Sequence, residues 1–323
     1  MSSAPDPTVT VFGAEGVKDL PGLEAVAGDL RLRFAASAGE LERLIPDTEI
    51  LLSWDFRADI LEDIWPQAGE LRWIHWSGAG VDAALFPGLR DSSVALTNAR
   101  GVFDRPIAEY VLGLVLCMAK GFPRTVLAQQ RRQWDFRLSE SIAGRSALVV
   151  GAGNIGSAIG GMLRAAGMRV AGVGRSARDG DPVFGKVHAF DELDRLLGEV
   201  DYVINITPST PATRGLFPAE RFRRMKASAR FINVGRGDAV DEPALVEALR
   251  QGAIAGAALD VFAEEPLPES SPLWEMDNVI VSPHMSGDVH ESVPALVEQF
   301  VDNLRRYLDG QPLLNVVDKQ RGY

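Results

Sequence analysis

Short apolar runs alternate with helical patterns along most of the chain. Five runs in the first hundred residues have the length and composition of strands, namely Thr8–Phe12, Arg31–Phe34, Glu49–Leu52, Arg72–His75 and Val94–Thr97. Apolar residues at helical spacing lie between several of them, at Ala38–Ile45 and Ala58–Trp65. This alternation is typical of a parallel sheet built from βαβ units.

A second series of the same kind follows a long apolar segment. The segment from Asp104 to Gly121 has apolar residues around much of a helical surface, which predicts a buried helix. Six strands are then predicted, at Ala147–Val150, Arg169–Val173, Tyr202–Ile206, Arg230–Val234, Ala257–Val261 and Asn278–Val281. Six strands with crossover helices suit a doubly wound, dinucleotide-binding sheet.

The last helical pattern indicates how the two series are connected. Between Asp288 and Leu308 the apolar residues recur on one face, at Leu296, Phe300, Leu304 and Leu308. A helix of this length could return to the first domain. We therefore expect an α/β protein with two doubly wound parallel-sheet domains, a Rossmann-type domain inserted into a flavodoxin-like one. The predicted domains are residues 1–100 with 288–323, and residues 101–287.

Composition narrows the class of partner. The 323 residues include 33 basic and 44 acidic side chains, for a net charge of −11. This excess of acid argues against non-specific binding to nucleic acid or to an acidic membrane, which needs a basic face. Val111–Ala119, the longest apolar stretch, is too short to span a bilayer, and Met1–Pro7 lacks the pattern of a secretory signal. Cys117 is the only cysteine, which excludes an intrachain disulfide and fits a cytoplasmic location.

A glycine-rich turn follows the first strand of the second series. Residues 151–156 read Gly-Ala-Gly-Asn-Ile-Gly and lead into a helical pattern. Gly151 permits the tight turn, Gly153 lets the main chain approach a pyrophosphate, and Gly156 allows the helix to pack closely on the strand. The helix N-terminus would face the phosphates. The pattern predicts a dinucleotide site at Gly151, Gly153, Asn154, Ile155 and Gly156; a purely structural turn is the alternative.

The residues after the second strand bear on the choice of cofactor. Enzymes that use NAD usually carry an acidic residue about 20 positions beyond the glycines, where it binds the ribose hydroxyls. Here the strand runs into Gly174-Arg175-Ser176-Ala177-Arg178, and the first acid is Asp179. Arg175, Ser176 and Arg178 could hold a 2′-phosphate by charge-assisted hydrogen bonds. We predict NADP, with NAD as a possible cofactor and a solvated basic loop as the alternative.

Three charged side chains follow the fourth, fifth and sixth strands of this series. Arg236 lies between two glycines, Glu265 precedes a proline, and His284 follows Ser-Pro. The carboxyl ends of parallel strands meet at one edge of a sheet, so these side chains should converge beside the cofactor. Glu264 is a second candidate for the carboxylate. No two histidines or cysteines have the spacing of metal ligands, and no metal is predicted.

Five further motifs occur in order along the chain: Gly78–Asp82, Thr207–Thr213, Gly235–Asp241, Asp260–Pro266 and Ser282–His284. With the glycine turn, they resemble the D-isomer-specific 2-hydroxyacid dehydrogenase family over nearly the whole length. Within the family the chain looks most like the glyoxylate/hydroxypyruvate reductases, because of the Gly174-Arg175-Ser176 segment and the compact length.

The resemblance implies an oxidoreductase that transfers a hydride between NADP(H) and a small 2-oxoacid or D-2-hydroxyacid. Arg236 would bind the substrate carboxylate and polarise the ketone. His284 would act as the acid/base, and Glu265 would orient the imidazole and favour its charged form. The main-chain N–H groups of Ala79 and Gly80 would bind the carboxylate from the first domain. Further cofactor contacts are implied at Thr207, Pro208, Thr213, Val234 and Asp260.

The resemblance also implies a two-fold dimer through the cofactor domains, in which Trp134 and Phe136 would be covered. One alternative is an NAD-linked dehydrogenase for a larger D-2-hydroxyacid, and another is a non-catalytic, nucleotide-sensing protein of the same fold. The segment Asn205–Pro208 is more polar than the apolar run usual in the family. Candidates for the substrate rim, with core packing as the alternative, are Trp54, Arg57 and Trp76.

Overall fold

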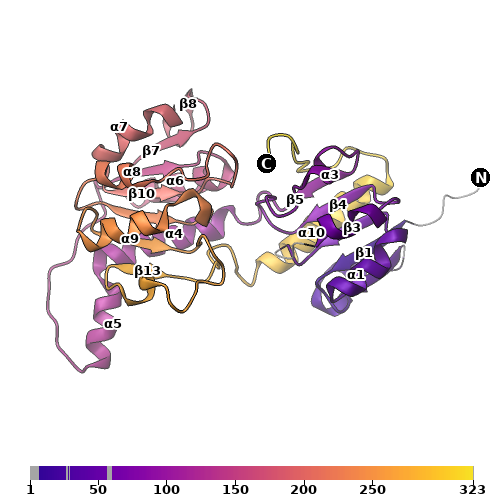
Figure 1. Cartoon of the computed structure of the whole chain (residues 1–323), viewed down its shortest axis with the longest axis horizontal. Coiled ribbons are helices and arrows are strands. Elements are labelled where there is room, and N and C mark those ends of the chain that lie inside the picture. Colours follow the sequence, from indigo (N-terminus) through magenta and orange to yellow (C-terminus); the bar gives the residue numbers. More distant parts are fainter. Residues whose placement is uncertain (1–6, 27, 29, 57–59, 323) are drawn as a thin grey trace, which may run out of the picture. The chain divides into compact units, whose positions relative to one another are not determined.

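The chain divides into two compact units (Figure 1). The computed structural model describes residues 7–26, 28, 30–56 and 60–322. One unit is Met1–Phe103 with Val289–Tyr323, and the other is Asp104–Asp288, so the second unit is inserted into the first. We describe each unit by itself.

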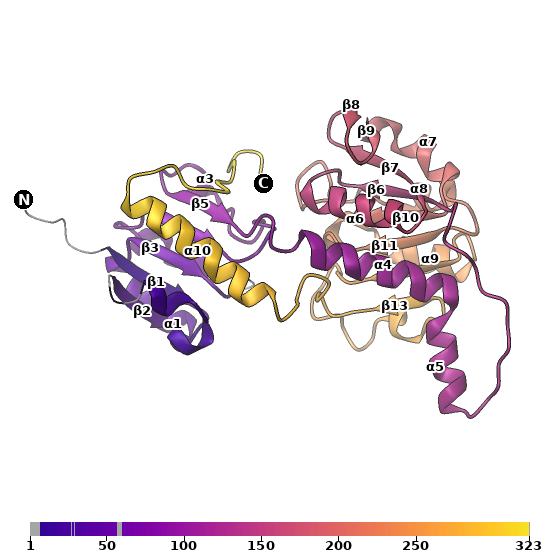
Figure 2. The same cartoon turned by 180° about the vertical axis from the view of Figure 1, so that it is seen from behind.

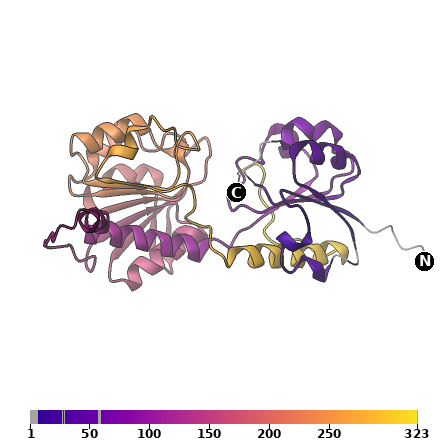
Figure 3. The same ribbon diagram turned by 90° about the horizontal axis from the view of Figure 1, so that it is seen from below.

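The first unit is a five-stranded parallel sheet in the order β2-β1-β3-β4-β5. Its strands are β1 (Thr8–Phe12), β2 (Arg31–Ala35), β3 (Ile50–Ser53), β4 (Trp73–Trp76) and β5 (Ala95–Asn98). Each of the five predicted strands is present. One face is covered by α1 (Ala38–Leu44), α2 (Leu61–Ile64) and α3 (Pro87–Arg90), and the other by α10 (Ser292–Leu308) (Figure 3).

Alternating side chains of the strands fill the two sides of this sheet. Val9 and Val11 of β1 pack with Phe300 and Leu304 of α10, whereas Phe12 packs on the opposite side with the short helices. This period of two is the one expected of strands that are covered on both faces.

Two predicted helices of this unit differ from the structure. The helix predicted at Ala58–Trp65 is α2, which ends before Pro66; its first predicted residues lie outside the described ones. The helix predicted from Asp288 begins at Ser292. Pro294 fixes that start, because a proline is tolerated only in the first turn of a helix. Leu308, predicted on the buried face, is 47% exposed at the last turn.

The second unit is an eight-stranded sheet in the order β13-β12-β11-β10-β6-β7-β9-β8. Its strands are β6 (Ser146–Val150), β7 (Arg169–Gly174), β8 (Arg178–Asp181), β9 (Gly185–Ala189), β10 (Tyr202–Asn205), β11 (Arg230–Asn233), β12 (Gly256–Leu259) and β13 (Val279–Val281). The six predicted strands are present. The β8–β9 hairpin was missed, because its residues are mostly polar and only Val187 is fully buried. β9 continues the parallel order beside β7, and β8 pairs with it antiparallel.

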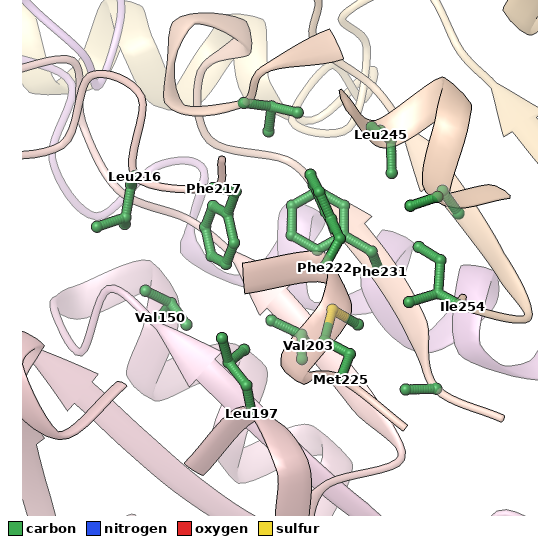
Figure 4. Close-up of a cluster of buried hydrophobic side chains, with 14 of the residues drawn as sticks. Val150, Leu197, Val203, Leu216, Phe217, Phe222, Met225, Phe231, Leu245 and Ile254 are labelled. Atoms are coloured by element: carbon green, nitrogen blue, oxygen red, sulfur yellow. The ribbon is translucent and has the colours of Figure 1, made fainter. Parts of the chain in front are cut away.

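Helices cover both faces of the second sheet (Figures 2 and 3). α4 (Asp104–Lys120) packs along α6 (Asn154–Ala165) on one face. On the other face lie α7 (Leu193–Leu196), α8 (Ala219–Arg224) and α9 (Glu242–Arg250). The core beneath them contains Phe217, Phe222 and Phe231 (Figure 4), with ring centroids of Phe231 4.9 Å and 5.4 Å from the other two. Edge-to-face contacts of this kind add to the apolar burial.

The helix predicted from Asp104 to Gly121 is α4, which ends at Lys120. It is buried along one face only, because Arg105, Glu109 and Gly113 are exposed. Gly121 follows with a φ of +63°, which suits a glycine. α5 (Phe122–Gln130) continues from it at an angle of 63°. Within the described residues no single helix is long and apolar enough to cross a membrane, although α4 and α5 reach that length and hydropathy together.

Candidate active site

The Glu265 and His284 side chains are in contact at the carboxyl edge of the second sheet. Glu265 Oε2 lies 2.7 Å from His284 Nδ1, and both side chains are 34% exposed. The other carboxylate oxygen, Oε1, accepts a hydrogen bond from the Phe262 N–H at 2.9 Å. The carboxylate is therefore held from two sides, and it can hold the imidazole in one tautomer with Nε2 left for chemistry.

The surroundings of Glu265 stabilise its ionised carboxylate. Burial alone would raise the pKa of its carboxyl, but the hydrogen bonds from His284 and the Phe262 N–H and the nearby positive charge of Arg236 lower it. The lowered pKa keeps Glu265 ionised well into the acid range. Arg236 lies close enough to act on this carboxylate, and its guanidinium also donates to the Gly235 carbonyl at 2.9 Å.

His284 is held in a left-handed backbone conformation, with φ of +51°. Such a conformation costs a non-glycine residue about 1 kcal/mol or more. Its main-chain N–H donates to the Asp260 carbonyl at 2.8 Å. The Asp260 carboxylate is fully buried and accepts from Ser282 Oγ, Met285 N and Ser286 N at 2.7, 3.0 and 2.9 Å. Asp260, predicted as a cofactor contact, thus fixes the turn that carries His284.

The glycine turn has the steric requirements that its sequence predicts. A Cβ on Gly151, whose φ is +116°, would lie 2.6 Å from the Ile206 carbonyl oxygen, and one on Gly156 would lie 1.8 Å from that of Gly151. A Cβ on Gly153 would meet nothing within 4 Å, so this residue faces open space. α6 begins directly after it, at Asn154, and Ile155 follows in its first turn. An anion could therefore reach the N–H groups at this helix start.

The segment after β7 presents Arg175 and Ser176 at the surface. Arg178 is engaged: its guanidinium donates to the Ala152 carbonyl at 2.9 Å and pairs with Asp181 at 2.8 Å. Burial would raise the pKa of Asp181, but hydrogen bonds from the Phe184 and Val183 N–H groups and from Arg178 lower it. Asp181 was not predictable from the sequence, because its contact depends on the β8–β9 hairpin.

The loop after β10 is braced by its own hydroxyl groups. Thr213 Oγ1 donates to the Pro208 carbonyl at 2.5 Å and accepts from the Thr210 N–H at 2.9 Å. Thr207 and Thr213 are both almost fully buried. Val234, at the end of β11, donates its N–H to the Asn205 carbonyl at 3.0 Å, so the strand ends beside this loop are tied together.

In the first unit, three carbonyl groups of the loop after β4 accept hydrogen bonds. The Gly78, Ala79 and Gly80 oxygens accept from Ala99 N, Asn98 Nδ2 and Trp76 Nε1 at 3.1, 2.7 and 2.9 Å. Within the described residues, the N–H groups of Ala79 and Gly80 donate to no protein acceptor. The loop thus presents two donors suited to a carboxylate, and Asn98 is a contributor that the sequence did not reveal.

Of the three candidates for the substrate rim, the two tryptophans pack in the first unit. Trp76 is 1% exposed and serves the loop through its indole N–H. Trp54 packs, partly buried, against the apolar cluster under α10. Arg57 lies outside the described residues.

Other histidines are occupied elsewhere. His75 is buried beside Thr97, with Nδ1 2.8 Å from Oγ1, and burial lowers its pKa to about 3, so it stays neutral. His188 pairs with Glu192 at 2.8 Å. In the described part of the chain, no group of three His, Cys, Asp or Glu side chains is placed to hold a metal ion.

Comparison with known proteins decides the family. Residues 112–286 match the family model described as "D-isomer specific 2-hydroxyacid dehydrogenase, NAD binding domain". The chain belongs to this family of D-2-hydroxyacid dehydrogenases. The family resemblance and the α/β class predicted from the sequence are confirmed, and the protein is an NAD(P)-dependent oxidoreductase.

Relatives and solved structures of the 2-hydroxyacid dehydrogenase family cover most of the chain. It is 33% identical to a glyoxylate reductase of Thermofilum pendens, over 88% of this chain and 85% of that protein. A D-isomer specific 2-hydroxyacid dehydrogenase of Xanthobacter autotrophicus Py2, solved with NADPH and MES, is 34% identical, with a TM-score of 0.86 over 98% of this chain and 100% of that one.

Three further matches complete the comparison. An NADPH-dependent glyoxylate/hydroxypyruvate reductase of Sinorhizobium meliloti, solved with NADP and sulfate, is 28% identical, with a TM-score of 0.84 over 98% of this chain and 100% of that chain. The chain also matches D-3-phosphoglycerate dehydrogenases of Methanocaldococcus jannaschii and Synechocystis at 30% identity, but spans only 56% and 51% of their lengths.

Proposed function

We propose that this dehydrogenase reduces a small 2-oxoacid, of the glyoxylate or hydroxypyruvate kind, to the 2-hydroxyacid with NADPH. The observation that carries the proposal is the 2.7 Å contact between Glu265 and His284, with the charge of Arg236 beside it. The relatives and solved structures named for this activity support the choice of substrate.

Each charged side chain has a distinct role in this mechanism. Arg236 binds the substrate carboxylate by fork-shaped donation and polarises the ketone. His284 donates a proton from Nε2 to the carbonyl oxygen in reduction, and takes it back in oxidation. Glu265 orients the imidazole through Nδ1 and favours its protonated form. The nicotinamide, when bound, supplies the hydride that reduces the carbonyl carbon.

The cofactor would be held by the glycine turn and the strand ends beside it. Gly153 faces open space at the start of α6, which suits the pyrophosphate. Arg175 and Ser176, exposed after β7, suit a 2′-phosphate, and the solved relatives with NADPH or NADP support this preference. Thr207, Pro208, Thr213, Val234 and Asp260 complete the proposed contacts.

A turnover assay with both cofactors tests the proposal. We expect NADPH-dependent reduction of glyoxylate and hydroxypyruvate, with kcat/KM higher than for bulkier 2-oxoacids. His284→Ala should lower kcat by about 10²–10⁴-fold, the usual effect of losing a general acid, while binding of NADPH followed by fluorescence stays unchanged. His188→Ala is the matched control and should keep full activity.

Other results would favour other functions. A preference for a bulkier 2-oxoacid with NADH would indicate the larger-substrate dehydrogenase. NADPH binding without turnover of any 2-oxoacid would indicate a nucleotide-sensing protein.

A further inference from the structure

Two buried asparagine side chains face each other at the ends of neighbouring strands in the second unit. Asn205 is the last residue of β10 and Asn233 the last of β11, and the two are paired in register. They are 0% and 1% exposed. Asn205 Nδ2 donates to Asn233 Oδ1 at 2.9 Å. We refer to the two side chains as the amide pair.

The remaining polar atoms of the amide pair bond to the two loops that leave these strands. Asn205 Oδ1 accepts from the N–H and the hydroxyl of Thr207, at 3.3 and 2.9 Å. Asn233 Oδ1 also accepts from the Gly235 N–H at 3.2 Å, and Asn233 Nδ2 donates to the Arg236 carbonyl at 3.0 Å. Each amide oxygen therefore faces donors, and each amide nitrogen faces an acceptor.

The two loops also touch directly. A Cβ on Gly235 would lie 2.8 Å from the Thr207 carbonyl oxygen and 2.9 Å from its nitrogen. The main chain before Arg236 thus lies against the main chain of Thr207 with no room for a side chain. One loop therefore cannot move without displacing the other, because protein interiors are closely packed.

We propose that Asn205 and Asn233 are positioning residues for substrate binding: the amide pair sets the main chain of Arg236 against the Thr207 loop. The guanidinium then meets the 2-oxoacid carboxylate at a fixed distance from the cofactor that this loop borders. The inference rests on the proposed function of Arg236. It also explains why the segment Asn205–Pro208 is polar, which the family resemblance did not explain.

Substitution of Asn233 tests the bond to Arg236 directly. Asn233→Asp keeps the oxygen that accepts from Asn205 and Gly235, and replaces the donor to the Arg236 carbonyl by a second, negatively charged oxygen. We expect KM for hydroxypyruvate to rise about tenfold or more, and Kd for NADPH, measured by fluorescence, to stay within about twofold. Asn233→Ser loses both the donor and the acceptor of the amide without adding charge, so it should raise KM at least as much, and it keeps the test available if the aspartate variant does not fold.

Substitution of Asn205 tests whether the pair acts as a relay. In Asn205→Asp an oxygen replaces the donor, so two oxygen atoms would face each other. Rotation of the Asn233 amide relieves this contact but turns its oxygen toward the Arg236 carbonyl and breaks that bond. We expect the same rise in KM, about tenfold, although residue 205 makes no hydrogen bond to Arg236.

Asn303 provides a matched control for a merely structural effect. It is fully buried in α10 of the other unit, where Nδ2 donates to the Leu314 carbonyl at 3.1 Å and Oδ1 accepts from the Leu314 N–H at 2.7 Å. Asn303→Asp should lower the unfolding temperature and leave KM unchanged.

The outcomes separate this inference from the proposed function. If Arg236→Ala raises KM but the variants of Asn205 and Asn233 keep it within about twofold of the wild type, the amide pair does not position Arg236 and the inference is wrong. If Arg236→Ala itself leaves KM unchanged, the proposed function of Arg236 is wrong. If Asn303→Asp raises KM as much as the others, the effect is one of stability, and the inference is wrong again.

Discussion

Glu265 is a carboxylate whose ionisation is favoured by its neighbours more than burial disfavours it. Its two oxygens are divided between the imidazole of His284 and the N–H of Phe262. A group placed in this way acts on the protonation of its partner, since a fixed negative charge favours the cation beside it. Activity should therefore depend on pH through this contact.

Replacing Glu265 by Gln removes the charge and keeps the shape. Because the pKa of Glu265 is lowered, the wild-type carboxylate is charged from mildly acid pH upward, and the variant lacks this charge at every pH. Reduction needs a proton on His284, and the variant lacks the negative charge that favours it. The fall of kcat/KM for 2-oxoacid reduction with rising pH should move to lower pH, so activity near pH 8 falls most. Glu264→Gln is the control, and a Glu265→Gln profile that overlays the wild type after scaling would show that Glu265 is not the partner.

At this scale the sequence predicted the charged residues of the site and missed residues that support the surrounding loops. Arg236 and His284 stand directly after strands, and the parallel order of those strands brings them to one edge whatever the details of register. The contacts of Asn98 and Asp181 depend on which residues lie opposite each other in space. A polar residue in a loop carries no periodic signal of such a contact.

At the scale of elements, the β8–β9 hairpin bears on cofactor choice. It places Asp181 against Arg178, whose guanidinium is thereby held by this carboxylate and the Ala152 carbonyl. Arg178 would have to leave these partners to bind a phosphate. Arg175 precedes the hairpin and is exposed, and it is the arginine that we propose for the 2′-phosphate.

Arg175→Ala should therefore weaken NADPH more than NADH. Loss of a charge-assisted hydrogen bond to the 2′-phosphate should cost about 1–3 kcal/mol in kcat/KM with NADPH. The matched Arg178→Ala should affect both cofactors alike, through the glycine turn that it supports. A wild-type enzyme that prefers NADH would contradict the prediction.

In the same sheet, Asp201 joins the amino ends of the central strands β6 and β10. Its carboxylate accepts from the N–H and hydroxyl of Ser146, both at 2.9 Å, and pairs with Lys226 at 3.2 Å. Burial would raise its pKa, but these bonds lower it. A pKa lower in the folded than in the unfolded state stabilises the fold above the ordinary carboxyl pKa of about 3.9, and the gain is lost as pH falls through the folded value.

Asp201→Asn should accordingly lower the stability of the second unit in a pH-dependent way. At pH 7 we expect a loss of about 1–2 kcal/mol in the free energy of unfolding, measured with denaturant. The difference from the wild type should shrink as the pH is lowered below about 4. Asp47, 81% exposed and 3.8 Å from Arg33, gives the control, since Asp47→Asn should change stability little. A loss that is the same at pH 3 and pH 7 would rule out this electrostatic explanation.

At the scale of the whole molecule, the order of elements was predictable, whereas the backbone conformation of one surface segment was not. Both sheets follow from repeated apolar runs, and the insertion follows from a final helix that completes the first unit. The segment 133–140 after α5, which we name the arm, has no such pattern. Polar and apolar residues alternate in it, as in a strand, but in the described residues it is not part of either sheet.

The alternation of the arm has a physical meaning in the structure. Asp135 pairs with Arg124 of α5 at 2.7 Å, and Arg137 donates to the Gly121 carbonyl at 2.6 Å. The apolar residues that alternate with them are exposed: Trp134, Phe136 and Leu138 are 97%, 83% and 92% exposed. Glu140 closes the arm through its N–H to the Ala119 carbonyl at 3.0 Å. The chain thus fixes the polar side of the arm and leaves the apolar side uncovered.

We propose that a second copy of the chain covers this apolar side in a two-fold dimer, because large apolar side chains almost fully exposed in a row are typical of contact surfaces. Sedimentation at micromolar concentration should show twice the 34.9 kDa of the chain. The combined substitution of Trp134, Phe136 and Leu138 by Ser should leave a folded species of 34.9 kDa. Trp274→Ser, at a tryptophan 53% exposed outside the arm, should leave the dimer intact. If the wild type sediments only at 34.9 kDa, no second copy covers the arm. If Trp274→Ser is a monomer while the triple variant of the arm stays a dimer, the contact lies near Trp274 and not at the arm.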